Sequence, residues 1–436
     1  MRRIKNLIAI ATFVVFLFIS SCSNASTNVV VLENTDLPAT SSALLPSPTF
    51  VNTEVPMSLP LPPIKKQCVS ESIKSTNLAL DGVIVLQRAK GGVYDTYPFF
   101  FFDAKTKSKF KTINDSNSIE VSPDGKFLAY TYDDSTGEKE FIEILNSEGD
   151  SLSQFVLFFD GHWWSHFKWQ NSQELRITTI ANENKILAHL LNPYTKTHTA
   201  LNSDWQDVHN SVPPYNKNSP HWEFDYYVYG ANIFYDPTLS IVLYPKDNEI
   251  ISLTNVKTKS EITNAHFKNW GKLPSWSSNG DYLSIVSHEE NTDEFYLLFK
   301  NDPKFRRVTN FSKEFSFASI PGYTWSPSGN QIAFWLNLES DGNATGTQSE
   351  LAILDIPSRQ VTRLCIQGIS AFTFDPVEMT NPDPIWSPDE KYIMITQWDN
   401  FESPSKYYVL VVNLENGNIE KFDENLQPSG WMMSNP

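Results

Sequence analysis

A short phrase that recurs along the chain constrains its fold more than any other feature. Its clear copies are Val121–Tyr130 (VSPDGKFLAY), Trp276–Ile285 (WSSNGDYLSI), Trp325–Phe334 (WSPSGNQIAF) and Trp386–Ile395 (WSPDEKYIMI). In this pattern the Ser can accept hydrogen bonds from nearby amides, the Pro fixes φ, and the Gly takes the left-handed conformation of a tight turn. Each copy therefore predicts a β-hairpin, an apolar strand end followed by a turn and an alternating strand.

Two weaker copies lie between the clear ones, at Trp169–Thr178 and Tyr235–Tyr244. The six anchors are 41 to 66 residues apart, and a four-stranded propeller blade takes about 40–50 residues. No segment after residue 70 has convincing helical periodicity. We therefore expect an all-β fold, a six-bladed β-propeller of four-stranded blades.

The first blade lacks an inner strand of its own. Its second to fourth strands are expected at Gly82–Arg88, Tyr97–Asp103 and Ser108–Ile113. The chain ends in the short apolar segment Ser429–Ser434. We predict that this C-terminal strand joins the first blade and closes the ring between the two ends of the chain.

The Trp-Ser-Pro-Asp-Gly repeats resemble those of TolB-type β-propellers, and the same repeat occurs in the propeller domains of prolyl-oligopeptidase-type peptidases. The resemblance covers most of residues 80–434. It implies a fold and not an activity, because one fold supports many functions.

The amino terminus predicts export. Arg2, Arg3 and Lys5 precede the apolar run Leu7–Ile19, as in a secretory signal. The run ends in Ile-Ser-Ser-Cys22, which resembles the bacterial lipoprotein box and implies cleavage before Cys22 with lipid on its thiol and amine. The protein would then lie in the bacterial cell envelope, lipid-anchored, with the propeller facing outside the cytoplasm. The alternative is an ordinary signal in which Cys22 is incidental.

The composition changes abruptly after the signal. Ser, Thr, Asn and Pro dominate up to about Lys66, and Phe50 is the one aromatic residue there. Such a segment cannot bury enough apolar surface to fold alone. We expect three parts: a lipoprotein signal peptide at 1–21, the lipidated Cys22 with a disordered tether at 22–66, and the propeller domain at 67–436.

The charge balance excludes one class of partner. The net charge is −16, and removal of the three basic residues of the signal lowers it to −19. A surface this acidic lacks the basic stripe that nucleic-acid backbones require. It is also repelled by anionic lipid, so membrane association is expected through the anchor at Cys22 alone.

Two further cysteines, Cys68 and Cys365, remain after Cys22. In an oxidising compartment they could pair and attach the incoming chain to the fifth of the expected blades. The alternative is two unrelated thiols. Two cysteines this far apart do not make a zinc site, and the sequence predicts no metal.

Catalytic signatures are absent from the sequence. It has no Gly-x-Ser-x-Gly elbow, no His-Glu-x-x-His segment, no phosphate-binding glycine loop and no dinucleotide fingerprint. We therefore assign no catalytic residue and no cofactor.

Aromatic and His residues gather in the segments that connect blades, or second to third strands, which open on one face of a propeller. We call this the loop face. Such loops carry function disproportionately, and exposed rings suit sugar stacking or peptide binding. The alternative is that these rings plug the channel mouth. The candidate ligand-binding residues are His162, Trp163, Trp164, His166, Trp205, His221, Trp222, His266 and Trp270.

Taken together, these features favour a lipid-anchored, extracytoplasmic binding or scaffolding module for a protein, peptide or glycan ligand. Two alternatives stay open: a propeller-fold hydrolase or lyase acting on envelope or extracellular glycans, and a TolB-like envelope assembly factor. Two carboxylates converging at the channel mouth would favour the enzyme.

Overall fold

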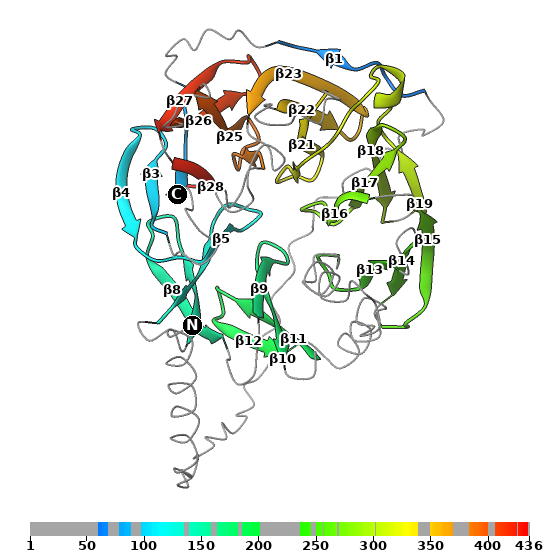
Figure 1. Cartoon of the computed structure of the whole chain (residues 1–436). Helices are drawn as coiled ribbons and strands as arrows, with labels where there is room; N and C mark the ends of the chain where they lie inside the picture. Colours follow the sequence, from blue (N-terminus) through cyan, green and yellow to red (C-terminus); the bar gives the residue numbers. More distant parts are fainter. Residues whose placement is uncertain are drawn as a thin grey trace, which may run out of the picture. The chain divides into compact units, whose positions relative to one another are not determined.

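The computed structural model describes residues 60–68, 78–88, 97–134, 139–157, 164–181, 185–200, 236–245, 250–255, 257–267, 270–300, 302–338, 349–368, 383–399, 406–424 and 426–434. These residues form seven β-sheets arranged in a ring, which belongs to the compact unit Val55–Pro436 (Figure 1). None of them forms a helix long and apolar enough to cross a membrane. The all-β propeller predicted from the repeats is therefore confirmed.

Each sheet is one blade, and its neighbouring strands pair antiparallel, except for the short strand β1 (Lys65–Lys66), which is added parallel to the edge of blade 6. The first three blades are β28 (Leu426–Met432), β2 (Val83–Arg88), β3 (Phe99–Asp103) and β4 (Ser108–Ile113); then β5 (Ser118–Val121), β6 (Leu128–Asp133), β7 (Glu140–Leu145) and β8 (Ser151–Leu157); then β9 (Trp164–Trp169), β10 (Leu175–Ala181), β11 (Lys185–Asn192) and β12 (Thr197–Ala200).

The other four blades follow in chain order. They are β13 (Ile241–Pro245), β14 (Ile250–Asn255) and β15 (Glu261–His266); β16 (Trp270–Trp276), β17 (Tyr282–Glu289), β18 (Thr292–Phe299) and β19 (Asp302–Arg307); β20 (Tyr323–Trp325), β21 (Gln331–Leu336), β22 (Ser349–Asp355) and β23 (Gln360–Gly368), extended by β1 (Lys65–Lys66); and β24 (Ile385–Trp386), β25 (Tyr392–Asp399), β26 (Lys406–Asn413) and β27 (Ile419–Glu424).

The predicted number of six blades is wrong, because the structure has seven. The six phrases mark the turns between first and second strands, and blade 1 has such a turn in two pieces. Trp431 lies next to the last residue of β28, and its indole Nε1 donates a hydrogen bond of 2.9 Å to the carbonyl of Asp81, just before β2. Gly82 has φ +97°, in the same left-handed region as Gly125 in an intact phrase. The phrases therefore number one fewer than the blades.

The C-terminal strand closes the ring as predicted. β28 pairs antiparallel with β2, with Ile84 opposite Trp431 and Val83 opposite Met432. Its backbone also lies close to blade 2, where the amide of Met433 donates to the carbonyl of Gly125 at 2.8 Å. The first blade is thus built from both ends of the propeller segment.

The turn chemistry of the phrase is confirmed in the structure. The Oγ of Ser122 accepts a hydrogen bond from the amide of Phe127 at 3.0 Å, five residues later. The Ser of each other clear phrase does the same, with amides at Tyr282, Gln331 and Tyr392. In blade 4, Asp236 takes this position, and its Oδ1 accepts from the amide of Ile241 at 2.6 Å. A buried polar side chain thus shapes each of these five turns.

The hydrophobic core lies between the blades. Each cluster of buried side chains joins two neighbouring sheets: one includes Val286 of blade 5 and Phe334 of blade 6, and another includes Ile142 of blade 2 and Leu175 of blade 3. The alternating residues of each strand supply these two opposite faces. The ring therefore depends on every blade having a neighbour on both sides.

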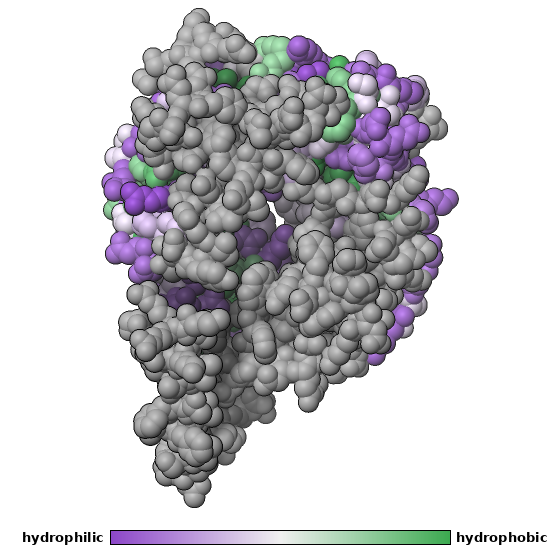
Figure 2. All heavy atoms as spheres, viewed as in Figure 1, coloured by the Kyte–Doolittle hydropathy of each residue, from purple (hydrophilic) through white to green (hydrophobic). Residues whose placement is uncertain are grey.

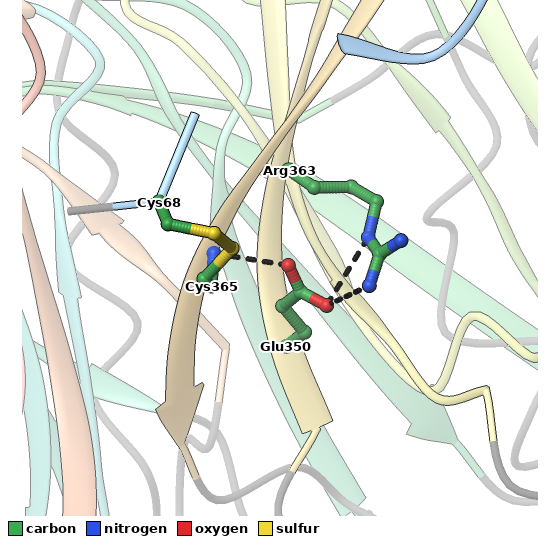
Figure 3. Close-up of a disulfide and its surroundings, with 4 residues drawn as sticks. All are labelled: Cys68, Glu350, Arg363 and Cys365. Atoms are coloured by element: carbon green, nitrogen blue, oxygen red, sulfur yellow. Dashed lines mark hydrogen bonds and ion pairs between the residues drawn. A yellow bond between two sulfur atoms is a disulfide. The ribbon is translucent and has the colours of Figure 1, made fainter. Parts of the chain in front are cut away.

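A strap, residues 60–68, fastens the incoming chain to the outer edge of blade 6. β1 pairs parallel with β23, and Ile64 packs against the core shared by blades 5 and 6. Cys68 is bonded to Cys365, where β23 has a bulge and Cys365 has φ +58° (Figure 3). The strap lies partly in the segment 22–66 that we assigned to the tether.

The buried carboxylate of Glu350 organises the bulge beside the disulfide. Its Oε1 accepts from the amide of Cys365 at 2.9 Å, and its Oε2 accepts from Nε of Arg363 at 3.1 Å (Figure 3). The Arg363 guanidinium also lies 5.3 Å from the ring centre of Phe315. Polar side chains of blade 6 therefore fix the backbone around Cys365, the cysteine to which the strap is bonded.

Trp431 provides a test of ring closure. Its side chain is 3% exposed and stacks on Tyr392 of blade 7 with 5.9 Å between ring centres. We expect Trp431→Ala to lower the free energy of unfolding by roughly 3–5 kcal/mol, because it leaves a cavity and removes the bond to Asp81. Met433→Ala is the control, since that side chain is 41% exposed and its loss should cost less than about 0.5 kcal/mol. Equal shifts in urea midpoint would contradict the closing role.

Candidate functional site

The predicted loop-face residues lie mostly outside the described part of the chain. This holds for His162, Trp163, Trp205, His221 and Trp222. The backbones of Trp164 and His166 belong to β9, and Trp270 begins β16. His266 ends β15 and is exposed. These positions flank connections between blades, as expected for the loop face.

The structure brings Trp270 and His288 to the same end of blade 5. Trp270 pairs with Ser287, the neighbour of His288 on β17. The hairpin between β17 and β18 joins second to third strand, so this end of the sheet belongs to the loop face. Blade 5 is where the site can be built from described side chains, because the following connection, Val308 to Gly322, is also described.

His288 forms a dyad with Asp293 across this hairpin. The two residues are register partners, and Nδ1 of His288 lies 2.8 Å from Oδ1 of Asp293. The other oxygen of Asp293 accepts from the amide of Ile320 at 2.7 Å. The His288 side chain is 37% exposed and that of Asp293 is 8% exposed. A buried carboxylate thus orients a partly exposed imidazole on the loop face.

A polar network centred on Arg307 fixes the connection next to this dyad. The guanidinium pairs with Glu289 at 3.0 Å and with the fully buried Glu294, and it donates to Oδ1 of Asn310 at 3.2 Å. The Tyr296 hydroxyl donates to Glu289, and burial followed by this bond raises the pKa of Tyr296. These contacts tie the end of β19 to β17, β18 and the connection that follows β19 on the loop face.

Blade 2 places two carboxyl groups directly opposite each other at its loop-face end. Asp133 ends β6, and its register partner Glu140 begins β7. Asn117 donates to Oδ2 of Asp133 at 3.2 Å. Burial, and then the charge of Asp133, raise the pKa of Glu140 to about 7. Glu140 can therefore hold or release a proton near neutral pH beside a second carboxyl group, the arrangement that acid–base chemistry uses.

A third acidic group lies on the inner strand of blade 2. Glu120 accepts a hydrogen bond from the amide of Trp169 at 3.0 Å, and the Trp169 indole donates to the Glu120 carbonyl at 3.1 Å. Burial raises the pKa of Glu120, against the opposing charges of Lys168 and Arg176. These contacts join the inner strands of blades 2 and 3.

Sequence reasoning missed Asp293, Glu140 and Glu120 as members of these groups. The signal for the first was available, because His288 and Asp293 form the second residue pair from a two-residue turn and must face each other once the hairpin register is known. The pairing of Glu140 with Asp133 likewise follows only once the register of β6 and β7 is known. Where described residues are visible in Figure 2, the rim is mostly hydrophilic with small hydrophobic areas.

The solved structures that resemble this chain share little sequence with it. No family model matches the sequence, and no curated protein gives a significant match. The chain is similar to TolB from Acinetobacter baumannii, with 12% identity over 85% of this chain and 97% of that one and a TM-score of 0.41. An uncharacterised protein from Listeria monocytogenes has 10% identity, covers 83% of this chain and 97% of its own, and has a TM-score of 0.47.

A functionally unknown protein from Desulfotomaculum acetoxidans has 9% identity over 81% of this chain and 99% of its own, with a TM-score of 0.43. Similarity at this level does not transfer a function. The propeller architecture follows from the strand pairings described above.

The raised pKa of Glu140 predicts a pH dependence of stability. Its folded pKa of about 7 exceeds the ordinary glutamate value of 4.5, so the folded state holds the proton more tightly than the unfolded one. The stabilising contribution is full below pH 4.5 and is lost as the pH rises through 7. At pH 8.5, Glu140→Gln should be more stable than the wild type by up to about 3 kcal/mol, and at pH 4 the two should agree.

The control for this test is Glu148→Gln, which alters an exposed carboxylate of the same blade. Urea unfolding of the three proteins across this pH range provides the measurement. A Glu140→Gln profile parallel to that of the wild type would show that the carboxyl group is not perturbed.

Proposed function

We propose that this chain is a lipid-anchored, extracytoplasmic β-propeller that binds a protein, peptide or glycan ligand on its loop face. The anchor is Cys22, and the residues between it and the strap form the tether. No nucleic acid is a partner of so acidic a chain. The ligand contacts include the loop-face Trp and His residues named above, next to the His288–Asp293 dyad.

The observation that carries this proposal is the bond between Cys68 and Cys365. Structural disulfides form and persist in oxidising compartments and are rare in the cytosol. The bond joins residues 297 positions apart and sits among organised polar groups at Glu350 and Arg363. It therefore supports export of the domain, in agreement with the signal and the lipoprotein box.

The position of the strap supports the choice of the loop face. β1 extends blade 6 at its outermost strand, β23, so the incoming chain meets the domain at the rim. The ends of the strands, where the blade connections lie, are a different part of the surface. On blade 5 these ends carry the half-exposed His288 supported by buried groups, which suits a preorganised binding surface.

Cellular location can be tested through the three cysteines. In its bacterial host, wild-type protein should partition with membranes, whereas Cys22→Ala should be released or remain unprocessed. Cys68 and Cys365 of the exported protein should resist a thiol-reactive polymer until a reductant is added. A variant lacking residues 2–21 stays in the cytosol as the control, and there Cys68 and Cys365 should react together with the unmodified Cys22. Unchanged partitioning of Cys22→Ala, or free thiols in the exported protein, would contradict the proposal.

The binding face can be tested without a known ligand. Trp325 is a repeat residue that stacks on Tyr282 and donates to the carbonyl of Ser275 at 3.2 Å, so Trp325→Ala should lower stability by at least about 2 kcal/mol. Trp222→Ala and Trp270→Ala should stay within about 1 kcal/mol of the wild type. Thermal melts of the three variants compare these effects. Losses as large as that of Trp325→Ala would show that the loop rings pack the fold instead of meeting a ligand.

A second candidate function is that of a hydrolase or lyase that cleaves envelope or extracellular glycans. It is favoured by the carboxyl pair of Asp133 and Glu140. The perturbed pKa of Glu140 suits a general acid. The variant Glu140→Gln therefore has a second use: if the protein releases fragments from cell-wall glycans, this substitution should abolish release and Glu148→Gln should not. Absence of release by the wild type would leave binding as the function.

A further inference from the structure

Two imidazole rings meet on the outer half of blade 3, away from blade 5. His189 lies on β11 and His198 on the neighbouring strand β12. Nε2 of His198 lies 2.8 Å from Nδ1 of His189, and the ring centres are 4.6 Å apart with an angle of 49° between the ring planes. One ring must donate and the other accept in this contact, so at least one proton is shared between two metal-ligating nitrogens.

The hairpin that carries the two rings is well defined. Asn192, at its turn, accepts hydrogen bonds through Oδ1 from the amides of Tyr194 and Thr195, both at 3.0 Å. Leu191, the register partner of His198, is buried in the core between blades 2 and 3. The ring of Phe155 from blade 2 meets His198 edge-on, with 6.4 Å between ring centres. The imidazoles are therefore placed by the sheet and by a neighbouring blade, and His198 itself is exposed.

The spacing of the two nitrogens matches that of adjacent ligands on a metal ion. A first-row transition metal binds imidazole nitrogen at about 2.0–2.1 Å, which puts two ligands at right angles about 2.9 Å apart. The observed 2.8 Å is thus close to that separation, and both rings would turn off the line of the hydrogen bond to direct their lone pairs at one ion. The shared proton would leave to solvent as the ion enters.

From this geometry we propose that His189 and His198 form a two-ligand site for a divalent transition-metal ion. Imidazole suits Cu²⁺, Ni²⁺ and Zn²⁺. Of these three ions, Cu²⁺ is expected to bind a given nitrogen site most tightly. Within the described residues, no third His, Cys, Asp or Glu completes a larger cluster. In this proposal water fills the remaining positions, and the site is an exchangeable one that bridges β11 and β12.

The site is independent of the loop-face function, because it lies on the two outer strands of a different blade.

The test uses the full-length chain without a polyhistidine tag, in detergent and freed of metal with a chelator. Binding of Cu²⁺, Ni²⁺ and Zn²⁺ is measured by competition with a chromophoric chelator. We expect the dissociation constant for Cu²⁺ to rise at least tenfold in His198→Ala and in His189→Asn. The copper spectrum of the wild type should show two nitrogen ligands, and that of His198→Ala should have lost one of them.

The matched control is His266→Ala, which removes another exposed strand His from blade 4. It should bind copper like the wild type. Melting curves without metal establish that the variants fold, and added Ni²⁺ should raise the melting temperature of the wild type and of His266→Ala but not of His198→Ala. Equal affinity and equal melting shifts in the wild type and His198→Ala would overturn the proposal, as would an equal loss in His266→Ala.

Discussion

The pairing of β28 with β2 is the interaction on which the rest of the structure depends. A propeller blade buries its two faces against its neighbours. An open ring would therefore expose the faces that blades 1 and 7 bury against each other. Here the last strand of the chain completes the first blade, and Trp431 packs against blade 7 while its indole binds the carbonyl of Asp81. One strand thus completes a sheet and also joins two cores.

Much of this fold could be predicted from the sequence because the repeats carry their own turn chemistry. A Ser whose hydroxyl binds the amide five residues later is a local feature, visible as Ser122 and Phe127 in one phrase. The number of blades was wrong because the six phrases were counted without the first blade, whose strands β2 to β4 precede them. The turn of blade 1 is divided between Trp431 and Gly82, so it never appears as a continuous phrase, and a count of phrases falls one short.

The candidate sites depended on register, which the sequence did not supply. Asp293 faces His288, and Glu140 faces Asp133, only when the pairing of two strands is known. The same holds for His198. In the strand register it lies opposite Leu191, and its partner His189 is two residues before Leu191 on β11. Composition and spacing identified the loop face through its aromatic residues, but they could not select which polar side chains come within hydrogen-bonding distance.

The order of attachments along the chain has a mechanical consequence. Cys68 precedes β2, so a pull on the amino-terminal segment reaches the disulfide before it reaches the closing blade. The load then passes through Cys365 into β23. This strand is part of blade 6, where it pairs with β22. Without the covalent bond, the same force would peel β2 away from β28 and open the ring at its seam. The strap diverts tension from the one junction in the propeller that no peptide bond secures.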